Sequence, residues 1–246
     1  AQKEALIQTG KQHYSDMLTL EKAPTAAHEQ MYQQALQQGK IRLATDINNL
    51  CATLAVIFSK TVSVDVPLIL VSLVRAGLPI GVLLQRALSD SSASYSLPSK
   101  HYGVSIIRDR GLDPVALHKI RELHPDSPIV FVDGWTGKGA IYGELVRSLA
   151  NNLAPSLEPD SESTNSSNHN NGLTRDNVFH QGQGVIPLLT LADPAGVAWL
   201  SASSDDWLIP SGLLGCTVSG LISRTLFSEA SEDLSEGLHR SVIYEE

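Results

Sequence analysis

Residues 129–140 read Ile-Val-Phe-Val-Asp-Gly-Trp-Thr-Gly-Lys-Gly-Ala, and this stretch decides the fold. Its first four residues are apolar and follow Pro128, a pattern typical of a parallel strand buried on both faces. The loop after this strand holds three glycines, one carboxylate and one lysine. Residues 140–150 are then predicted to form a helix. Free backbone N–H groups at such a helix start favour an anion, most often a phosphate.

Length and composition narrow the class of protein. With 246 residues, of which 42% are hydrophobic, the chain can form one large α/β domain or a domain plus an extension. A net charge of −8 argues against general affinity for nucleic acids, because phosphate-backbone binders carry a basic face. Two cysteines are too few for a disulfide framework and predict a reducing, cytoplasmic location. The apolar runs have strand length, so no membrane span is expected.

The region before the first strand is predicted to be helical. Apolar residues recur every three or four positions over residues 26–59, Thr25 is a plausible N-cap, and Gly39 is the expected break. We therefore expect two helices or one kinked helix. Cys51 lies beside the apolar stripe and is interpreted as a small buried residue rather than a reactive thiol.

The rest of the chain repeats a strand, a short loop and a helix. The expected pairs are strand 67–74 with helix 78–88, strand 102–107 with helix 114–123, strand 129–132 with helix 140–150, and strand 185–191 with a short helix ending at 202. Asp113 and Pro114 have the N-cap and first-turn positions of the second helix. Residues 208–211 read as another short strand and residues 217–225 as a turn that leads into a helix. Residues 155–177 are almost free of apolar side chains and predict a solvated surface insertion.

These units predict an α/β fold with a doubly wound, mostly parallel sheet. Ligands of such sheets bind beyond the carboxyl ends of the strands. That rule groups Arg75, Arg108, Asp193 and residues 133–139 around one crevice.

The loop at 133–139 lacks the P-loop pattern, because Val132 and Gly139 stand where that pattern needs Gly and Ser or Thr. It offers a carboxylate for a ribose hydroxyl, a threonine hydroxyl, glycine N–H groups and a lysine for phosphate. The alternative is a glycine-rich turn with a surface lysine. Trp135 would shield the crevice, stack on a base, or act as a plain hydrophobic lid.

Arg75 directly follows an apolar strand, where a guanidinium needs a phosphate or carboxylate partner. An internal salt bridge with Asp133 or Asp193 is the alternative. Arg108 and Arg110 lie in a charged turn that is equally consistent with a solvated surface.

Cys216 lies at an expected helix start, where the pKa of a thiol can be lowered. A nucleophile also needs a base, and neither His180 nor His239, its nearest histidine neighbours along the chain, lies in a recognisable motif. Packing is therefore favoured over catalysis for this thiol. The eight histidines have no metal-ligand spacing, so no transition-metal site is predicted.

Four stretches together resemble the phosphoribosyltransferase-like family of bacterial tellurite-resistance and stress gene clusters, whose members are also labelled the cysteine protease StiP family. They are residues 71–88 (VSLVRAGLPIGVLLQRAL), 101–113 (HYGVSIIRDRGLD), 131–141 (FVDGWTGKGAI) and 217–225 (TVSGLISRT). The resemblance covers about residues 14–227 of the chain. It also implies that members of the family continue beyond the point where this chain stops.

The resemblance implies a phosphoribosyltransferase-like fold in which two strand-end loops hold phosphoribosyl diphosphate. A non-proline cis peptide bond is expected at Val74–Arg75 or beside it. Gly134 replaces the second of two adjacent acidic residues in the general enzyme motif. The positions implied to bind the ligand are Leu73, Val74, Arg75, Ala76, Gly77, Asp133, Gly134, Trp135, Thr136, Gly137, Lys138, Gly139 and Ala140.

The function expected on this basis is an Mg²⁺-assisted phosphoribosyltransferase that transfers or cleaves at ribose C1, with Asp133, Arg108 and Arg110 as catalytic residues. The site would act by positioning and by neutralising the leaving diphosphate. The Mg²⁺ would arrive on the ligand, and a homodimer is left open. Two alternatives remain: a cysteine hydrolase or protease with Cys216 as nucleophile, and a non-catalytic nucleotide sensor.

The expected domain organisation has three parts. Residues 1–60 are an N-terminal helical extension that packs on the core. Residues 61–228 are the phosphoribosyltransferase-like α/β domain, interrupted by the insertion at 155–177. Residues 229–246 are an acidic tail, where truncation is left open.

Overall fold

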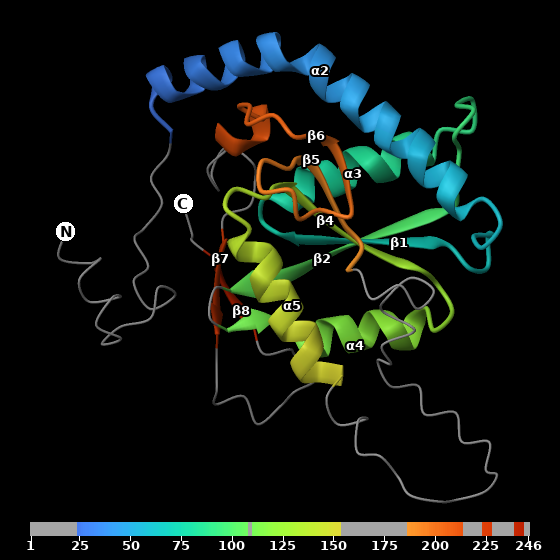
Figure 1. The fold of residues 1–246 in the computed structure, drawn as a ribbon. Helices are drawn as coiled ribbons and strands as arrows, with labels where there is room; N and C mark the ends of the chain where they lie inside the picture. Colours follow the sequence, from blue (N-terminus) through green and yellow to red (C-terminus); the bar gives the residue numbers. More distant parts are fainter. Residues whose placement is uncertain (1–23, 108–109, 154–185, 214–222, 228–238, 244–246) are drawn as a thin grey trace, which may run out of the picture.

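The computed structural model describes residues 24–107, 110–153, 186–213, 223–227 and 239–243. Within these ranges the protein has a mixed α/β fold built on a six-stranded sheet (Figure 1). The strand order is β3-β2-β1-β4-β5-β6, and every neighbouring pair is parallel except the antiparallel β2–β3 pair. The prediction of an α/β fold with a mostly parallel sheet is confirmed.

The element bounds are as follows. The sheet contains β1 (Leu68–Val74), β2 (Ser99–Ile107), β3 (Gly111–Leu112), β4 (Ile129–Trp135), β5 (Leu188–Ala192) and β6 (Leu200–Ser203). A separate antiparallel pair is formed by β7 (Ser223–Phe227) and β8 (His239–Ile243). The helices are α2 (Ala26–Phe58), α3 (Gly77–Leu88), α4 (Pro114–Leu123), α5 (Ala140–Leu153) and the short 3-10 helix η4 (Pro210–Leu213).

The chain direction across the sheet reverses at β1 and β4. After β1 the chain crosses to β2 on one side, and after the β2–β3 hairpin and α4 it returns to β4 on the other side of β1. These two strands pair in parallel over Ile69–Ile129 to Ser72–Val132, so their carboxyl ends lie next to each other. Such a reversal point is where open α/β sheets bind ligands.

Two hydrophobic cores lie on opposite faces of the sheet. Strand β1 contributes Leu68 and Leu70 to one core and Ile69, Val71 and Leu73 to the other, which is the two-residue alternation of a strand buried on both faces. Helices α2 and α3 cover the first face, and α4 and α5 cover the second (Figure 1).

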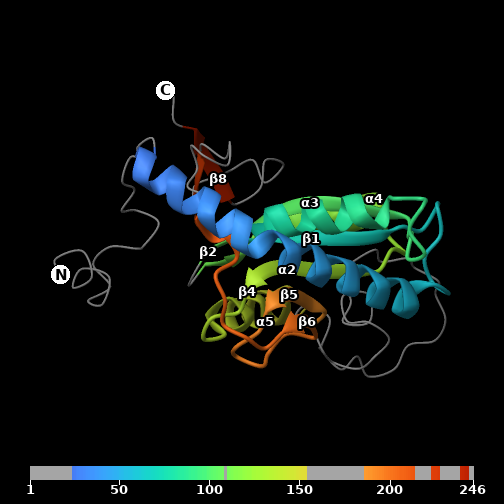
Figure 2. The ribbon, with the colours of Figure 1, turned by 90° about the horizontal axis from the view of Figure 1, so that it is seen from above.

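Helix α2 runs without interruption along the first face (Figures 1 and 2). The hydroxyl of Thr25 accepts a hydrogen bond from the backbone N–H of His28 at 3.2 Å, as expected for an N-cap. Of the two expectations for this region, two helices or one kinked helix, the first is wrong, because one helix spans Ala26–Phe58. A methyl carbon added at Gly39 would lie 2.9 Å from Cγ of Pro210, so this glycine permits a close contact rather than ending the helix.

Helix α2 is also long and apolar enough to cross a membrane, by length and composition alone. This is weak evidence, because core helices pass the same test. One third of its most apolar window is buried in the protein. The buried side chains of the helix are Ile47, Leu50, Cys51, Leu54 and Phe58, and all five belong to the first core.

Several predicted elements are corrected near the carboxyl end of the sheet. Strand β4 continues through Asp133 and Gly134 to Trp135 instead of ending at Val132. The helix expected to end at residue 202 is strand β6, and the strand expected at 208–211 overlaps helix η4. Residues 223–225 belong to strand β7 rather than to a helix. The insertion predicted at 155–177 lies outside the described residues.

Candidate functional site

A cavity of about 820 Å³ opens where the carboxyl ends of β1 and β4 meet. One wall comes from the start of α3, with Arg75, Ala76 and Pro79. A second comes from the end of β4, with Asp133, Gly134 and Trp135, joined by Ile141 of α5. The third wall is the segment after β6, from which Asp206, Trp207, Leu208, Ile209, Ser211 and Gly212 line the cavity. A cavity of this size can hold a small molecule or a short piece of a peptide.

The first predicted loop contributes to this cavity through Arg75 and Ala76. The peptide bond Val74–Arg75 is cis, which confirms the expectation for this position. Gly77 is buried against β4, where an added methyl carbon would overlap the carbonyl oxygen of Val132. Glycine at 77 therefore lets helix α3 begin directly against the neighbouring strand.

Asp133 is the buried carboxyl group of the cavity. Its side chain lies on strand β4 and the residue is 6% exposed. The backbone N–H of Gly134 donates to its Oδ1 at 2.8 Å. Burial raises the pKa of Asp133 to about 7, although the hydrogen bond from Gly134 acts in the opposite direction. This carboxyl group can therefore gain or lose a proton near neutral pH.

The loop between β4 and α5 is held by internal hydrogen bonds. The hydroxyl of Thr136 donates to Oδ1 of Asp193 at 2.8 Å, and its N–H donates to the carbonyl of Ala192 at 3.1 Å. Gly137 and Gly139 have positive φ angles of 55° and 80°, a backbone conformation that favours glycine.

Asp193, which directly follows strand β5, organises the same region. Its two oxygens accept hydrogen bonds from the hydroxyl of Thr136 and from the N–H groups of Val197 and Ala198. Burial raises the pKa of Asp193, but these hydrogen bonds outweigh it, so the pKa is lowered from its usual value. Asp193 therefore shapes the loop, and it is not among the cavity-lining residues.

The predicted ligand-binding residues thus separate into two groups. Within the described ranges, Arg75, Ala76, Asp133, Gly134 and Trp135 line the cavity. Seven other described positions do not appear in its lining: Val74, Gly77, Thr136, Gly137, Lys138, Gly139 and Ala140. Leu73 is buried in the second core. The binding roles of both groups stay predictions.

Of the two arginines of the charged turn, the structure describes only Arg110. Arg108 lies outside the described residues. Arg110 is exposed just before β3 and is not among the residues that line the cavity. Their catalytic roles stay predictions.

The two cysteines differ in what the structure says about them. Cys51 is completely buried in the first core, and its thiol donates to the carbonyl of Leu84 with a sulfur–oxygen distance of 3.7 Å. Burial raises the pKa of the Cys51 thiol to about 12. Because the thiolate is the reactive form, Cys51 is inert at neutral pH, as expected for a packing residue. Cys216 lies outside the described residues.

The histidines considered as bases for Cys216 are also placed only in part. His239 lies at the start of β8, where its Nδ1 is 2.5 Å from Oγ of Ser105 and its backbone N–H donates to Asp113 at 3.0 Å. These contacts attach β8 to the main sheet region. His180 lies outside the described part of the chain.

Sequence reasoning did not anticipate the third wall of the cavity. Leu208 and Ile209 fall in the short strand predicted at 208–211, and Trp207, just before it, has no predicted role. In the structure, two large apolar residues of the lining are partly exposed, Trp135 at 49% and Leu208 at 60%. No group of three or more His, Cys, Asp or Glu residues that could hold a metal occurs in the described part of the chain.

Comparison with known proteins identifies the family. A family model described as "Tellurite-like stress resistance cysteine protease StiP" matches residues 1–246. The chain belongs to the StiP family. A curated StiP relative, "Cysteine protease StiP" of Acinetobacter baylyi (strain ATCC 33305 / BD413 / ADP1), is 46% identical over 251 residues. The match covers 99% of this chain and 56% of the relative, so the chain spans little more than half of that protein. No solved structure matches the chain.

The StiP match confirms the family resemblance and corrects the predicted function. The expectation of a phosphoribosyltransferase is wrong, because the relative is named as a cysteine protease, which is a hydrolase. The predicted enzyme class, a glycosyltransferase, is wrong for the same reason. The error has a physical origin: strand-end loops and a parallel sheet define a scaffold that many unrelated reactions share, so they do not determine the chemistry.

Proposed function

We propose that the chain is part of a cysteine peptidase in which Cys216 is the nucleophile and the cavity receives the substrate. The observation that carries this proposal is the burial of Cys51. The chain has two cysteines, and a thiol with a pKa of about 12 does not form the nucleophilic thiolate at neutral pH. Of the two thiols in this chain, Cys216 is therefore the candidate nucleophile.

Chain connectivity supports a link between Cys216 and the cavity. Gly212 lines the cavity, and Cys216 follows it by four positions. Whatever its conformation, a chain of four residues spans at most about 14 Å. At this distance, one substrate can occupy the cavity and place a peptide bond at the thiol of Cys216.

The proposed reaction has two stages. The thiolate of Cys216 attacks the carbonyl carbon of a peptide bond, the C–N bond breaks, and the amine leaves with a proton. Water then attacks the thioester, which releases the carboxylic acid and restores the thiol. The proton-transfer group is not assigned to a residue.

The test compares two single variants in the full-length protein. Cys216→Ser should abolish hydrolysis of a fluorescein-labelled casein substrate, whereas Cys51→Ala should remain active per folded molecule. Iodoacetamide at pH 7.5 should alkylate Cys216 and leave Cys51 unmodified in the native protein, as read by peptide mass spectrometry. Full activity in Cys216→Ser, or a native Cys216 that resists alkylation, would rule out this assignment.

We also propose that the scaffold is phosphoribosyltransferase-like, in agreement with the earlier resemblance. The support is the order of the parallel strands, β2-β1-β4-β5-β6, with the cavity at the junction of β1 and β4. A crystal structure compared with phosphoribosyltransferases over the five parallel strands tests this proposal. A different path of the crossover connections would exclude it.

A second candidate function is that of a non-catalytic sensor of a phosphoribosyl ligand. The specific observation is that residues of both predicted loops, Arg75 and Asp133 among them, line the same cavity. Asp133 alone is a poor metal ligand because it is buried and its pKa is raised to about 7. Any Mg²⁺ would therefore be bound mainly by the phosphates of the ligand.

Titration calorimetry with phosphoribosyl diphosphate, with and without Mg²⁺, tests the sensor. Binding should weaken in Arg75→Ala, and diphosphate release should be absent. No heat of binding at millimolar ligand would exclude it.

A further inference from the structure

The third wall of the cavity is attached to helix α2 at three places. Near the start of the helix, Nε2 of His28 lies 2.6 Å from the carbonyl oxygen of Leu213. Further along, Gly39 lies against the ring of Pro210. One turn later, the side chain of Arg42 reaches the segment that precedes Trp207. Helix α2 therefore supports residues 203–213 from behind over nearly half of its length.

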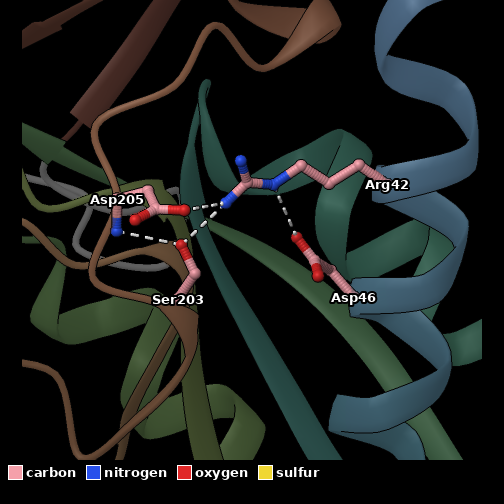
Figure 3. Close-up of polar contacts among 4 residues, drawn as sticks. All are labelled: Arg42, Asp46, Ser203 and Asp205. Atoms are coloured by element: carbon pink, nitrogen blue, oxygen red, sulfur yellow. Dashed lines mark hydrogen bonds and ion pairs between the residues drawn. The ribbon is translucent and has the colours of Figure 1, made fainter.

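Arg42 makes the most extensive of these contacts (Figure 3). Its Nη2 donates to Oδ2 of Asp205 at 2.7 Å and to Oγ of Ser203 at 2.9 Å. Its Nε lies 3.7 Å from Oδ2 of Asp46, one turn along the helix. The centre of the guanidinium also lies 4.6 Å from the centroid of the Trp207 ring. One planar cation thus connects both carboxylates and the indole.

Trp207 is the residue that connects this network to the cavity. Its ring contacts Arg42, and the same residue lines the cavity together with Leu208 and Ile209. Trp135 lies in the lining as well, from the end of β4. The cavity lining therefore includes two tryptophans and two branched apolar residues.

The charges of the cavity are few and suit a neutral group on this side. Arg75 belongs to another wall, at the start of α3, and Asp206 is exposed to solvent. Asp133 is buried, and burial raises its pKa to about 7, so it is less often charged than an exposed carboxylate. An apolar ligand group beside Trp207 would lose little hydration and would displace water from apolar surface.

We propose that this part of the cavity binds an aromatic or branched apolar side chain of a peptide, and that Arg42 is a positioning residue that fixes Trp207 for it. The inference rests on the proposed peptidase function and names its substrate class. Arginine suits the role better than lysine, because only a planar guanidinium can stack on an indole while it donates to Asp205 and Ser203.

Binding is measured separately from hydrolysis, in protein that carries Cys216→Ala. The probes are four blocked peptides, acetyl-Ala-X-Ala-amide, in which X is Phe, Leu, Ala or Glu. The Phe and Leu peptides should bind at least about 10-fold more tightly than the Glu peptide, since hydrophobic pockets discriminate by such factors. Equal affinity for Phe and Glu peptides would overturn the proposal.

Arg42→Met tests the positioning role because it keeps the length of the side chain and removes its charge. Affinity for the Phe peptide should fall about fivefold, the loss expected for one cation–π contact with its ion pair. Affinity for the Ala peptide should stay the same. Arg42→Lys should recover part of the loss, and tryptophan fluorescence should shift to longer wavelength in Arg42→Met.

The matched control is Arg147→Met on helix α5. Arg147 also donates to a carboxylate, Glu144, at 2.6 Å, and it is not among the cavity-lining residues. This variant should bind all four peptides like the parent protein. The same loss in both variants would mean that Arg42 acts only through general stability, and this outcome overturns its positioning role.

Trp207→Leu is the second variant, used should Arg42→Met fail to fold. It should lower the preference for Phe over Leu while the protein keeps its thermal transition. In protein with Cys216 intact, Arg42→Met should raise KM and leave kcat unchanged. Selective binding that depends on Arg42, without any hydrolysis, would refute the proposed peptidase and support this inference. Hydrolysis that does not depend on Arg42 or on residue X would support the peptidase and refute this inference.

Discussion

The contact between Gly39 and Pro210 makes a quantitative prediction about stability. In an exposed helix interior, Gly→Ala stabilises a protein by about 1 kcal/mol because alanine has the higher helix propensity. At position 39 the new methyl carbon would lie 2.9 Å from Cγ and 3.3 Å from Cδ of Pro210, and 3.6 Å from the Trp207 ring. A proline ring cannot rotate away, so the helix or the cavity wall must shift. Overpacking of this kind costs about 1–3 kcal/mol.

Gly39→Ala should therefore destabilise the protein by about 0–2 kcal/mol, the overpacking cost less the gain in propensity. Gly143→Ala is the matched control. Gly143 lies in helix α5, and a methyl carbon there would meet only Nη1 of Arg147, at 3.9 Å. With no overpacking, this control should stabilise the protein by up to about 1 kcal/mol.

The assay is urea unfolding followed by far-ultraviolet circular dichroism, with linear extrapolation to water. The free energies of unfolding of the two variants should differ by about 1–3 kcal/mol, with Gly143→Ala the more stable. Tryptophan emission should change in Gly39→Ala and not in Gly143→Ala, because only the first substitution reaches Trp207. If both alanines stabilise the protein equally, the contact between α2 and η4 is not as close as described.

Three further predictions concern single side chains. Burial raises the folded-state pKa of Asp133 from its usual 3.8 to about 7. Between these pH values the folded protein binds one more proton than the unfolded protein, so stability falls as pH rises across this window. The free energy of unfolding falls by about 4 kcal/mol at most over this window. In urea unfolding, Asp133→Asn should be more stable than the parent at pH 8 but not at pH 4. A stability difference that does not change with pH would contradict the raised pKa. Asp113→Ala should lower the free energy of unfolding by about 2 kcal/mol, because this carboxylate caps α4 and also accepts a hydrogen bond from the backbone of β8. Thr25→Ala, at an exposed cap, should lower it by about 1 kcal/mol or less in the same assay. Equal losses would show that the β8 contact is weak. Cys51 should react with a maleimide only after unfolding, as followed by intact mass in increasing urea, and rapid labelling of the native protein would show that it is not buried.

Local signals in the sequence were sufficient for the part of the fold that surrounds β1 and β4. The run at 67–74 is apolar at every position but one, and it forms strand β1, whose side chains contribute to both cores. Asp113 followed by Pro114 marked the start of α4, and Thr25 marked the start of α2. These signals succeed because capping and strand burial depend on residues that are close together in the sequence.

The sequence interpretation failed where a distant contact decides the local structure. Gly39 looked like a helix break because its propensity is poor, and its contact with Pro210 cannot be read from its neighbours. Residues 200–203 lack a strand signal of their own and form β6 because they pair with β5. The third wall of the cavity was missed for the same reason, since Trp207 is fixed by a helix at the other end of the chain.

The candidate site was therefore found in part. Arg75 and Asp133 were recognised because a charged residue at the end of a buried strand is rarely found without a charged or polar partner. Their chemistry was assigned by fold analogy, and the family comparison corrected it. The residue that carries the proposed hydrolysis, Cys216, had been considered only as the alternative.

The attachment of α2 to the third wall also has a consequence for biosynthesis. The two partners of the Arg42–Asp205 bond are 163 positions apart, and His28 and Leu213 are 185 apart. A chain that leaves the ribosome from its N-terminus exposes α2 long before residues 203–213 exist, so the wall cannot be fixed until more than four fifths of these 246 residues have been made. Nascent chains halted at residue 202 should therefore carry an α2 whose N-terminal half is cut easily by protease, and chains extended beyond residue 213 should be resistant there. The cavity can therefore be completed only after residues 203–213 have been made, long after α2.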